Sequence, residues 1–361
     1  MNPFIIFYCI IIFLITKFTV AEENLGSIVV TPNRTLVELN KVGSSVLMIN
    51  KKQIESSAST TTSGILQEFG GFSVSSKGNK GTDPSYFNRG LSRKYIKVLV
   101  DGMDLSDITS TQEEPTYIDN LNLISIESIE ILNGSQGTLY GGNAIGGVIS
   151  INSKLPEKYG FKESNYLEAG SYGSIKNSNS FSYANEKLQL VINLEGERSN
   201  GYNSFIDTGL APTEKDGYYL YGSSFLSNYI ITDEIEANFN GKFYKQHNEY
   251  DNNFSYPGDS ALYYRDDKLY ALLFDLTYNQ RNLSHKITFQ PTYTTRINTS
   301  GASYEYDGRK NKLEYIVSTN LFGIDFLSGF DYLKKNADMN GLLADKEIHS
   351  IFSEFRFKPL N

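Results

Sequence analysis

The fold is decided by Ile126-Glu-Ser-Ile-Glu-Ile-Leu-Asn-Gly-Ser-Gln-Gly-Thr-Leu-Tyr-Gly-Gly-Asn-Ala-Ile-Gly-Gly-Val-Ile-Ser-Ile151. The stretch begins as a predicted strand at residues 129–132 and ends as a second one at 148–152. Six glycines within residues 134–147 allow positive φ angles and close approach to a neighbouring backbone. On spacing alone this is a Gly-rich hairpin in a sheet. A phosphate-binding loop is not favoured, because no GxxxxGK[ST] pattern is present and no helix pattern follows the glycines.

The same stretch resembles the end of the plug domain of TonB-dependent outer-membrane receptors. Three further landmarks of that family precede it in order: a TonB-box-like Ile28-Val-Val-Thr-Pro32, an Ile-Arg-Gly-like Phe87-Asn-Arg-Gly90, and an Asp-Gly hairpin at Val98-Leu-Val-Asp-Gly102. One departure is that Asn133-Gly134-Ser135 stands where the family usually has Arg-Gly-Pro. The ion pair commonly made by that Arg is therefore expected to be absent or replaced.

Composition bounds the function classes. The chain has 361 residues, enough for two or more domains, and a formal net charge of −8. Without a basic patch or RNA-binding motif, no nucleic-acid partner is expected. The 26 Tyr and 22 Phe suit a β-barrel with aromatic girdles, although soluble sandwiches share that composition. The three histidines lack paired metal-ligand spacing, and the only cysteine, Cys9, lies in the N-terminal apolar run, so we expect no enzyme.

The N-terminal region carries targeting signals. Residues 1–21 are mostly apolar and end in small residues, which predicts a signal peptide cleaved after Ala21. The alternative is an uncleaved helical anchor, because the run is almost long enough to span a bilayer. Residues 22–40 are polar and irregular. The family resemblance implies that an added strand in this region pairs with the energising TonB–ExbB–ExbD complex, through Ile28, Val29, Val30 and Thr31.

Residues 41–153 are predicted to form a small mixed α+β domain. Strands are expected at 45–50 and 95–100, and an amphipathic helix at 61–69 stopped by two glycines. Asp101-Gly102 predicts a tight turn between strands. Residues 129–132 should pair with 148–151 or 96–100 in one mixed sheet, and a helix across 126–151 would exclude the family.

After Lys154 the pattern changes to long segments in which apolar and polar residues alternate. Segments of ten or more residues exceed the usual strand length of soluble sandwiches and match the apolar-out, polar-in code of an outer-membrane barrel. The residues expected to face lipid are Leu190, Ile192 and Phe239. Those expected to face the lumen or plug are Gln189, Asn193, Glu236 and Asn238.

The predicted fold is an α+β plug domain followed by an antiparallel transmembrane β-barrel. We expect a signal peptide (1–21), a TonB-box segment (22–40), a plug (41–153) and the N-terminal part of a barrel (154–361). About ten strands are expected, whereas the family's barrel has twenty-two. The final residue is not aromatic, so truncation at about half a barrel is expected. Such a half-barrel would leave two unpaired edges, which lipid does not tolerate.

The middle of the chain resembles the cobalamin-transporting members of the family more than its siderophore receptors. The matching segments are Asn200-Gly-Tyr-Asn203, Thr213-Glu-Lys-Asp-Gly217, Glu249-Tyr-Asp251, Tyr256-Pro-Gly258 and Lys268-Leu-Tyr270. In those members two outer loops hold calcium through clustered aspartates. The positions carried over are Asn203, Glu214, Asp216, Asp251 and Asp266. Oxygen ligands from several loops suit calcium, and the alternative is a solvated acidic rim.

The resemblance also implies that outward-facing plug loops contact the ligand. The matching polar positions, which suit the amide fringe of a corrinoid, are Asp83, Ser85, Ser92, Ser110 and Thr111. Each is equally well explained as an ordinary loop residue. The expected protein is a non-enzymatic TonB-dependent receptor for cobalamin or a related corrinoid in the outer membrane of a Gram-negative bacterium. A ferric siderophore or haem receptor is the alternative ligand class, and a non-transporting surface barrel or fragment is the alternative of another kind.

Overall fold

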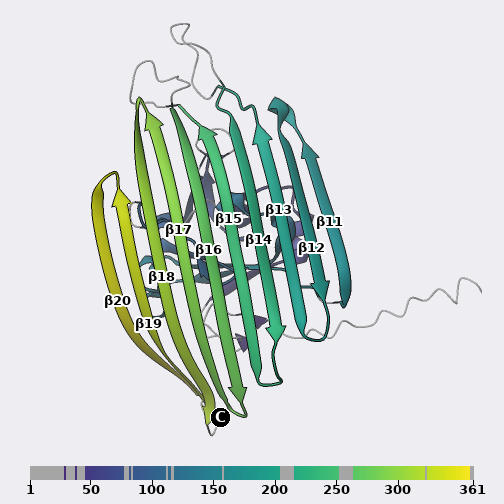
Figure 1. Cartoon of the computed structure of the whole chain (residues 1–361), viewed down its shortest axis with the longest axis vertical. Coiled ribbons are helices and arrows are strands. Elements are labelled where there is room, and N and C mark those ends of the chain that lie inside the picture. The colour runs from purple at the N-terminus through teal and green to yellow at the C-terminus, as the bar shows by residue number, and fades with distance from the viewer. Residues whose placement is uncertain are drawn as a thin grey trace, which may run out of the picture.

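The computed structural model describes residues 28–29, 37–38, 45–76, 81–82, 84–110, 113–114, 118–156, 158–203, 215–251, 263–321 and 323–357. Two sheets dominate this part of the chain: a five-stranded mixed sheet and a ten-stranded antiparallel sheet. Figure 1 shows the ten long strands as one curved wall, with the smaller N-terminal domain behind it. The predicted order, an α+β domain and then an antiparallel β wall, is confirmed. The expected signal peptide at 1–21 lies outside the described residues.

The five-stranded sheet is built around residues 126–151. Its strands are β3 (Val46–Asn50), β7 (Ile96–Val100), β8 (Met103–Asp104), β9 (Ile126–Asn133) and β10 (Gly147–Ser153). Their spatial order is β3-β9-β10-β7-β8, and β10 pairs antiparallel with β9 and parallel with β7. The predicted mixed sheet is therefore confirmed. Only a short helix, α4 (Gly137–Tyr140), and a 3-10 turn, η5 (Gly142–Ala144), lie between β9 and β10.

The Asp101-Gly102 turn joins β7 to β8, as predicted. Both residues have positive φ, 49° and 79°, a conformation that Asp and Gly tolerate better than most residues. The Asp101 carboxylate accepts hydrogen bonds from the backbone N–H of Ser153 at 2.6 Å and from its hydroxyl at 2.8 Å. Burial raises the pKa of Asp101, and these two hydrogen bonds oppose that rise. The turn is thereby tied to the last residue of the mixed sheet.

Two helices and a three-stranded sheet complete the plug, joined by short 3-10 turns. Their bounds are α2 (Lys51–Ser56), α3 (Thr62–Phe69), β4 (Ser73–Ser75), β5 (Ser85–Asn88), β6 (Leu91–Ser92), η2 (Arg93–Tyr95), η3 (Ile118–Asn120) and η4 (Leu123–Ser125). The predicted helix at 61–69 is confirmed as α3, whose N-cap, Thr61, accepts from the N–H of Gly64. Helix α2 was not predicted. Its start is a capping box in which Asn50 and Gln53 satisfy each other's backbone N–H groups.

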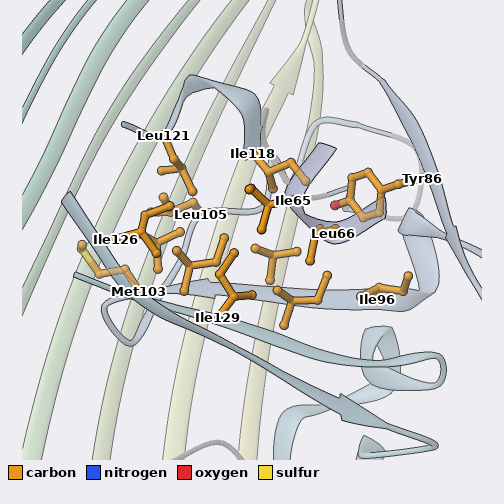
Figure 2. Packing of buried hydrophobic residues seen from close by; sticks show 14 of the residues in the cluster. Ile65, Leu66, Tyr86, Ile96, Met103, Leu105, Ile118, Leu121, Ile126 and Ile129 are labelled. Carbon is orange, nitrogen blue, oxygen red and sulfur yellow. The ribbon is translucent and has the colours of Figure 1, made fainter. Parts of the chain in front are cut away.

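The plug core lies between α3 and the mixed sheet. Figure 2 shows Ile65 and Leu66 of α3 facing Ile96 and Ile129 of the sheet. The same hydrophobic cluster continues onto the inner face of the long-stranded wall, through Leu220, Leu269, Ala271 and Leu273. Plug and wall therefore share one apolar core over strands β14 (Tyr218–Ile230) and β16 (Tyr263–Gln280).

The wall consists of strands that each pair antiparallel with the next in sequence. They are β11 (Gly160–Ala169), β12 (Ile175–Ala184), β13 (Leu188–Ser199), β14 (Tyr218–Ile230), β15 (Ile235–Glu249), β16 (Tyr263–Gln280), β17 (Leu283–Ser300), β18 (Ala302–Leu321), β19 (Ile324–Met339) and β20 (Leu342–Phe357). A 3-10 turn, η6 (Ser171–Gly173), joins the first two. Within the described chain, β11 and β20 are the two edges of this sheet.

The wall has an apolar outer face and a polar inner face. Ile192 and Phe239 are 39% and 45% exposed, whereas Asn193 and Asn240 are 6% and 7% exposed. Since alternate residues of a strand share a face, Leu190 lies outward with Ile192. The inward set is Gln189, Asn193, Glu236 and Asn238. The predicted faces are therefore confirmed.

The two rims of the wall differ in their connections. The long connections, residues 200–217 and 250–262, follow β13 and β15 at one rim, which we call the long-loop rim. The opposite, short-turn rim has the connections 185–187, 231–234 and 281–282. Figure 1 shows β13, β15 and β17 ending at the same rim. In the part of the chain that the structure describes, no helix is long and apolar enough to cross a bilayer.

Candidate functional site

A buried ion pair anchors the plug to the wall. The guanidinium of Arg296, on the inner face of β17, lies 2.9 Å from the Asp107 carboxylate and donates to the carbonyl of Thr109 at 3.2 Å. The same guanidinium lies 4.5 Å from the ring centroid of Tyr306 on β18. The ion pair and the hydrogen bond hold one segment of the plug, residues 104–110 and 113–114, which we call the anchor segment, while the cation–π contact holds the guanidinium against the wall.

Asp104 forms the second anchor. Its carboxylate lies 3.1 Å from the ammonium of Lys310 on β18 and also pairs with Lys97 of the plug. Lys310 is 4% exposed, and it donates to the carbonyl of Ser106 at 3.3 Å. Burial alone would raise the pKa of Asp104, but the two lysines outweigh burial and hold that pKa well below its usual range. The carboxylate therefore stays charged at neutral pH.

Other wall strands add polar contacts to the plug. Lys335 of β19 lies 2.5 Å from the Glu113 carboxylate. Gln290 of β17 donates to the carbonyl of Asp104 at 3.1 Å. Gln246 of β15 accepts from Asn120 at 2.6 Å and donates to the carbonyl of Gly81 at 2.9 Å. These contacts fix the plug against strands β15 to β19.

A polar shelf lies on the inner wall near the long-loop rim. Asn248, Arg265 and Asn298 are register partners across β15, β16 and β17. The guanidinium of Arg265 bonds Asp267 at 2.8 and 2.9 Å. The side-chain oxygens of Asn248 and Asn298 are buried and accept no hydrogen bond from any described residue. Such oxygens can accept from a ligand, because a buried acceptor gains when it is paired.

Aromatic rings extend this inner-wall shelf toward the rim. Tyr250 and Tyr263 stack with centroids 6.3 Å apart, and the backbone N–H of Tyr250 donates to the carbonyl of Tyr263 at 3.1 Å. None of these shelf residues was among the ligand-contacting positions expected from the sequence. The signal was present in the alternation of β15, β16 and β17, which assigns these residues to the inner face once the outer face is known.

The expected calcium positions fall at the long-loop rim. Asn203, Asp216 and Asp251 border the two long connections, and Glu214 lies outside the described residues. The backbone N–H of Asp216 donates to the carbonyl of Tyr202 at 3.3 Å. Gly217 donates from its N–H to the Glu249 carboxylate at 2.5 Å. The ends of both connections are therefore brought together at this rim.

The side chains at this rim differ in burial. Asp216 is only 1% exposed, and Asp251 is half-buried. Among the residues that the structure describes, no three His, Cys, Asp or Glu side chains converge closely enough to hold a metal ion. A calcium site here therefore stays a proposal.

Asp266 does not join this group. The structure turns it to the outer face of β16, where its carboxylate bonds Nδ1 of His247 at 2.9 Å. Its neighbour Asp267 lies on the inner face, is 5% exposed and pairs with Arg265. The one-residue difference reverses the face, because side chains alternate along a strand. Of these two neighbouring carboxylates, Asp267 rather than Asp266 lies on the inner face.

The plug residues expected to contact the ligand differ in where the structure places them. Asp83 and Thr111 lie outside the described residues. The Ser110 hydroxyl donates to the carbonyl of Asp107 at 2.7 Å and accepts from the N–H of Glu114 at 2.7 Å, so it serves the geometry of the anchor segment. Ser85 begins β5 and is half-buried. The Ser92 hydroxyl is buried and has no hydrogen bond to a described residue. Ser85 and Ser92 remain proposals.

The TonB-box-like residues are only partly described. Ile28–Val29 form a two-residue strand, β1, which pairs antiparallel with β2 (Val37–Glu38). Val30 and Thr31 lie outside the described residues. The backbone of this segment is therefore extended, as a docking strand requires.

The departure at Asn133 has a structural counterpart. The side-chain amide of Asn88 donates to the Asn133 side-chain oxygen at 2.9 Å and to the carbonyl of Gly146 at 3.4 Å. Asn88 is 4% exposed. An uncharged amide pair thus joins β5 to the end of β9, where an ion pair was expected to be absent or replaced.

Comparison with known protein families gives one domain match. The family model described as "TonB-dependent Receptor Plug Domain" matches residues 38–148. This range includes the mixed sheet up to the start of β10.

Curated relatives extend the similarity beyond the plug. The chain is 30% identical over 272 residues to "Vitamin B12 transporter BtuB" of Vibrio vulnificus strain YJ016, which covers 72% of this chain and 41% of that protein. It is 25% identical over 336 residues to the protein of the same name from strain CMCP6, covering 88% and 51%. The chain therefore spans about two fifths to one half of the length of these relatives.

Solved structures share the fold. A ferric enterobactin receptor (PfeA) from Pseudomonas aeruginosa matches with a TM-score of 0.66 at 16% identity, over 87% of this chain and 56% of that one. The "Copper transporter OprC" matches with a TM-score of 0.67 at 15% identity, over 86% and 52%. At these identities the likeness establishes the architecture and leaves the ligand open.

Proposed function

Because the chain belongs to the TonB-dependent receptor family, we propose that it forms the plug and part of the barrel wall of an outer-membrane receptor that imports cobalamin or a related corrinoid. The observation that carries this proposal is the similarity to vitamin B12 transporters, which extends past the plug into the wall strands. The relatives are named as transporters, which supports transport rather than catalysis.

The geometry supports gated transport. The plug packs against the inner face of the wall through a shared apolar core and through the Arg296–Asp107 and Lys310–Asp104 ion pairs. A plug held in this way blocks the lumen at rest, so passage needs energy that favours a second state. We propose that the TonB–ExbB–ExbD complex supplies it by pairing with residues 28–31.

The inner-wall shelf supports a ligand rich in amides. Asn248 and Asn298 offer buried acceptor oxygens, and Tyr250 and Tyr263 offer apolar faces beside them. We propose that the shelf and the plug hydroxyls of Ser85 and Ser92 form opposite sides of the ligand site. Amide N–H groups on a corrinoid would donate to the asparagine oxygens.

Calcium would act on the loops of this site. Asn203, Asp216 and Asp251 supply oxygen donors of the type that Ca²⁺ prefers. The burial of Asp216 supports the fit, because a buried carboxylate at an acidic rim is stabilised by a cation. We propose that Asn203, Glu214, Asp216 and Asp251 would hold the ion and order the two long connections.

Equilibrium binding tests the ligand assignment. The receptor in detergent micelles is titrated with cyanocobalamin and, separately, with ferric enterobactin. We expect saturable cobalamin binding that weakens when Asn248 and Asn298 are both changed to Leu. Asn228, also on the inner face but at the short-turn end of β14, provides the matched control, and Asn228→Leu should leave the affinity unchanged.

A ferric siderophore is the second candidate ligand, favoured by the fold shared with ferric enterobactin receptors. Saturable binding of the iron chelate, with none for cobalamin, would reject the corrinoid assignment and keep the receptor class. Repeating the cobalamin titration with calcium and with chelator tests the loop proposal. Equal cobalamin affinity with calcium and with chelator would show that the acidic residues form only a solvated rim.

A further inference from the structure

Two lysines lie side by side on the outer face of the wall. Lys245 of β15 and Lys268 of β16 are direct register partners, and both are exposed. Directly opposite residues on one face have Cβ atoms about 5 Å apart. Like charges in this arrangement destabilise a sheet unless a counter-charge neutralises them.

The nearby acids are engaged elsewhere. Asp266 shares the outer face of β16 with Lys268, but its carboxylate bonds Nδ1 of His247 at 2.9 Å. Glu249 shares the outer face of β15 with Lys245, and its carboxylate accepts from the N–H of Gly217 at 2.5 Å. Within the described residues, neither lysine forms an ion pair or a hydrogen bond from its side chain.

The lysine pair lies where the apolar outer face of the wall ends, on the side of the long-loop rim. Phe243 and Tyr270 are the next pair of outward-facing register partners, two residues from the lysines on the side away from the long-loop rim. Their ring centroids lie 5.8 Å apart. Tyr221 of β14, 62% exposed, is the register partner of Lys245. Tyrosines mark membrane–water interfaces, and lysines near them extend their ammonium groups toward the headgroups. If the long-loop rim faces outward, as the proposed function requires, the pair lies at the headgroup level of the outer leaflet.

We propose that Lys245 and Lys268 bind the phosphate of a phosphomonoester-bearing lipid in the surrounding leaflet. A phosphomonoester carries about −1.5 to −2 charges at pH 7, which matches two ammonium groups. Tyr221 and Tyr270 border the pair and contact the first carbons of the lipid. The site lies on the face of the wall opposite to the ligand shelf, so the lipid and the transported ligand bind independently.

Lipid binding to the receptor in detergent micelles tests this site. The probe is diphosphorylated lipid A, followed by native mass spectrometry, with phosphatidylethanolamine as the lipid without a phosphomonoester. The variant K245Q/K268Q should bind lipid A roughly thirtyfold more weakly, from about 1 kcal/mol per lysine. The variant K245R/K268R keeps the charge and should retain binding, which separates charge from misfolding.

A matched control uses two exposed lysines near the short-turn rim. Lys162 and Lys187 are exposed there, and K162Q/K187Q should leave lipid A binding unchanged. The proposal would be overturned if wild type and K245Q/K268Q bound lipid A equally well, or if K162Q/K187Q lost as much lipid A binding as K245Q/K268Q. It would also be overturned if wild type bound phosphatidylethanolamine as tightly as lipid A. Full competition by inorganic phosphate at the lipid concentration would also overturn it, because the site would then take a free anion.

Cobalamin affinity is measured in the same preparations. It should be unchanged in K245Q/K268Q, because the lysines face away from the lumen. If wild type binds lipid A more tightly than K245Q/K268Q but does not bind cobalamin, the proposed function alone is rejected. If wild type binds cobalamin but binds lipid A no more tightly than K245Q/K268Q does, the lipid site alone is rejected.

Discussion

Arg296 joins three kinds of contact at one position of the wall. It pairs with Asp107, donates to Thr109 and lies over the ring of Tyr306. Its side chain is 12% exposed and that of Asp107 is 11% exposed, so the pair is largely removed from water. Removing one partner would leave the other charge buried without compensation, which costs far more than losing a surface pair.

We therefore expect Arg296→Ala to destabilise the docked plug by about 3–5 kcal/mol. The measurement is urea unfolding of the plug in micelles, with Asp107→Ala and the double variant completing a cycle. The exposed pair Lys334–Glu347 on the outer face is the control, and its loss should change nothing measurable. Additive effects of R296A and D107A would show that the two side chains do not interact.

Asp104 gives the anchor segment a defined pH dependence. Its pKa in the folded protein is lowered well below 3.8, so the unfolded chain takes up the proton more readily. The stability contributed by Asp104 is therefore complete above the unfolded pKa and is lost as pH falls below it. Asp101 has the opposite shift, and protonation there favours the folded state.

We expect plug stability to fall as pH drops from about 5 to about 3, with a smaller slope in Asp104→Asn. Asp101→Asn should make the slope steeper, because it removes a group that opposes the fall. Urea midpoints measured across this range give both slopes. An unchanged slope in Asp104→Asn would mean that the lysines do not hold the carboxylate charged.

Single residues also mark where sequence reasoning reached its limit. The acidic run at 266–267 pointed to a carboxylate at the rim, but only the strand register decides which of the two faces inward. The Asn88–Asn133 bond joins residues 45 positions apart. The resemblance to the family implied only that its ion pair is absent or replaced here, and the Asn88 partner of Asn133 followed from the packing of β5 against β9.

At the scale of elements, β18 is shaped to receive the plug. Gly308 lies on its inner face, and a Cβ there would meet Oγ1 of Thr294 at 2.7 Å and Cγ1 of Ile108 at 2.9 Å. The absence of a side chain therefore lets the anchor segment reach the wall, a common use of glycine inside a strand.

We expect Gly308→Ala to push the anchor segment away and to weaken plug docking by about 1–3 kcal/mol, the usual cost of overpacking. Urea unfolding and the protease sensitivity of the anchor segment report the change. Gly196→Ala in β13 is the control, because the nearest atom to its new Cβ belongs to Tyr221 at 3.8 Å. Equal effects of the two substitutions would show that strand propensity, rather than contact with the plug, sets the cost.

Elements were predicted well where a local pattern specifies them. The period of two in β13 and β15 gave both the strands and their faces, and the Asp-Gly pair gave the β7–β8 turn. Helix α2 was missed because it is six residues long and has a single buried residue, Ile54. Its Asn50–Gln53 capping box was the available signal.

At the scale of the whole molecule, the plug and the wall form one packed body. Lys310 meets the anchor segment across more than two hundred positions of sequence, as its bond to Ser106 shows. The inner-wall shelf likewise combines three strands. Local patterns carry no information on such pairings, so the fold class was predictable from sequence, whereas the anchor contacts and the shelf required the structure.

The central claim, energised import of a corrinoid, is tested by uptake of labelled cyanocobalamin in cells that express the receptor from its own gene. The comparison is between the wild type and a variant that lacks residues 28–31, with surface binding measured in parallel. If the receptor is energised through this segment, the deletion abolishes uptake and leaves surface binding intact. Uptake that continues unchanged without residues 28–31 would contradict it.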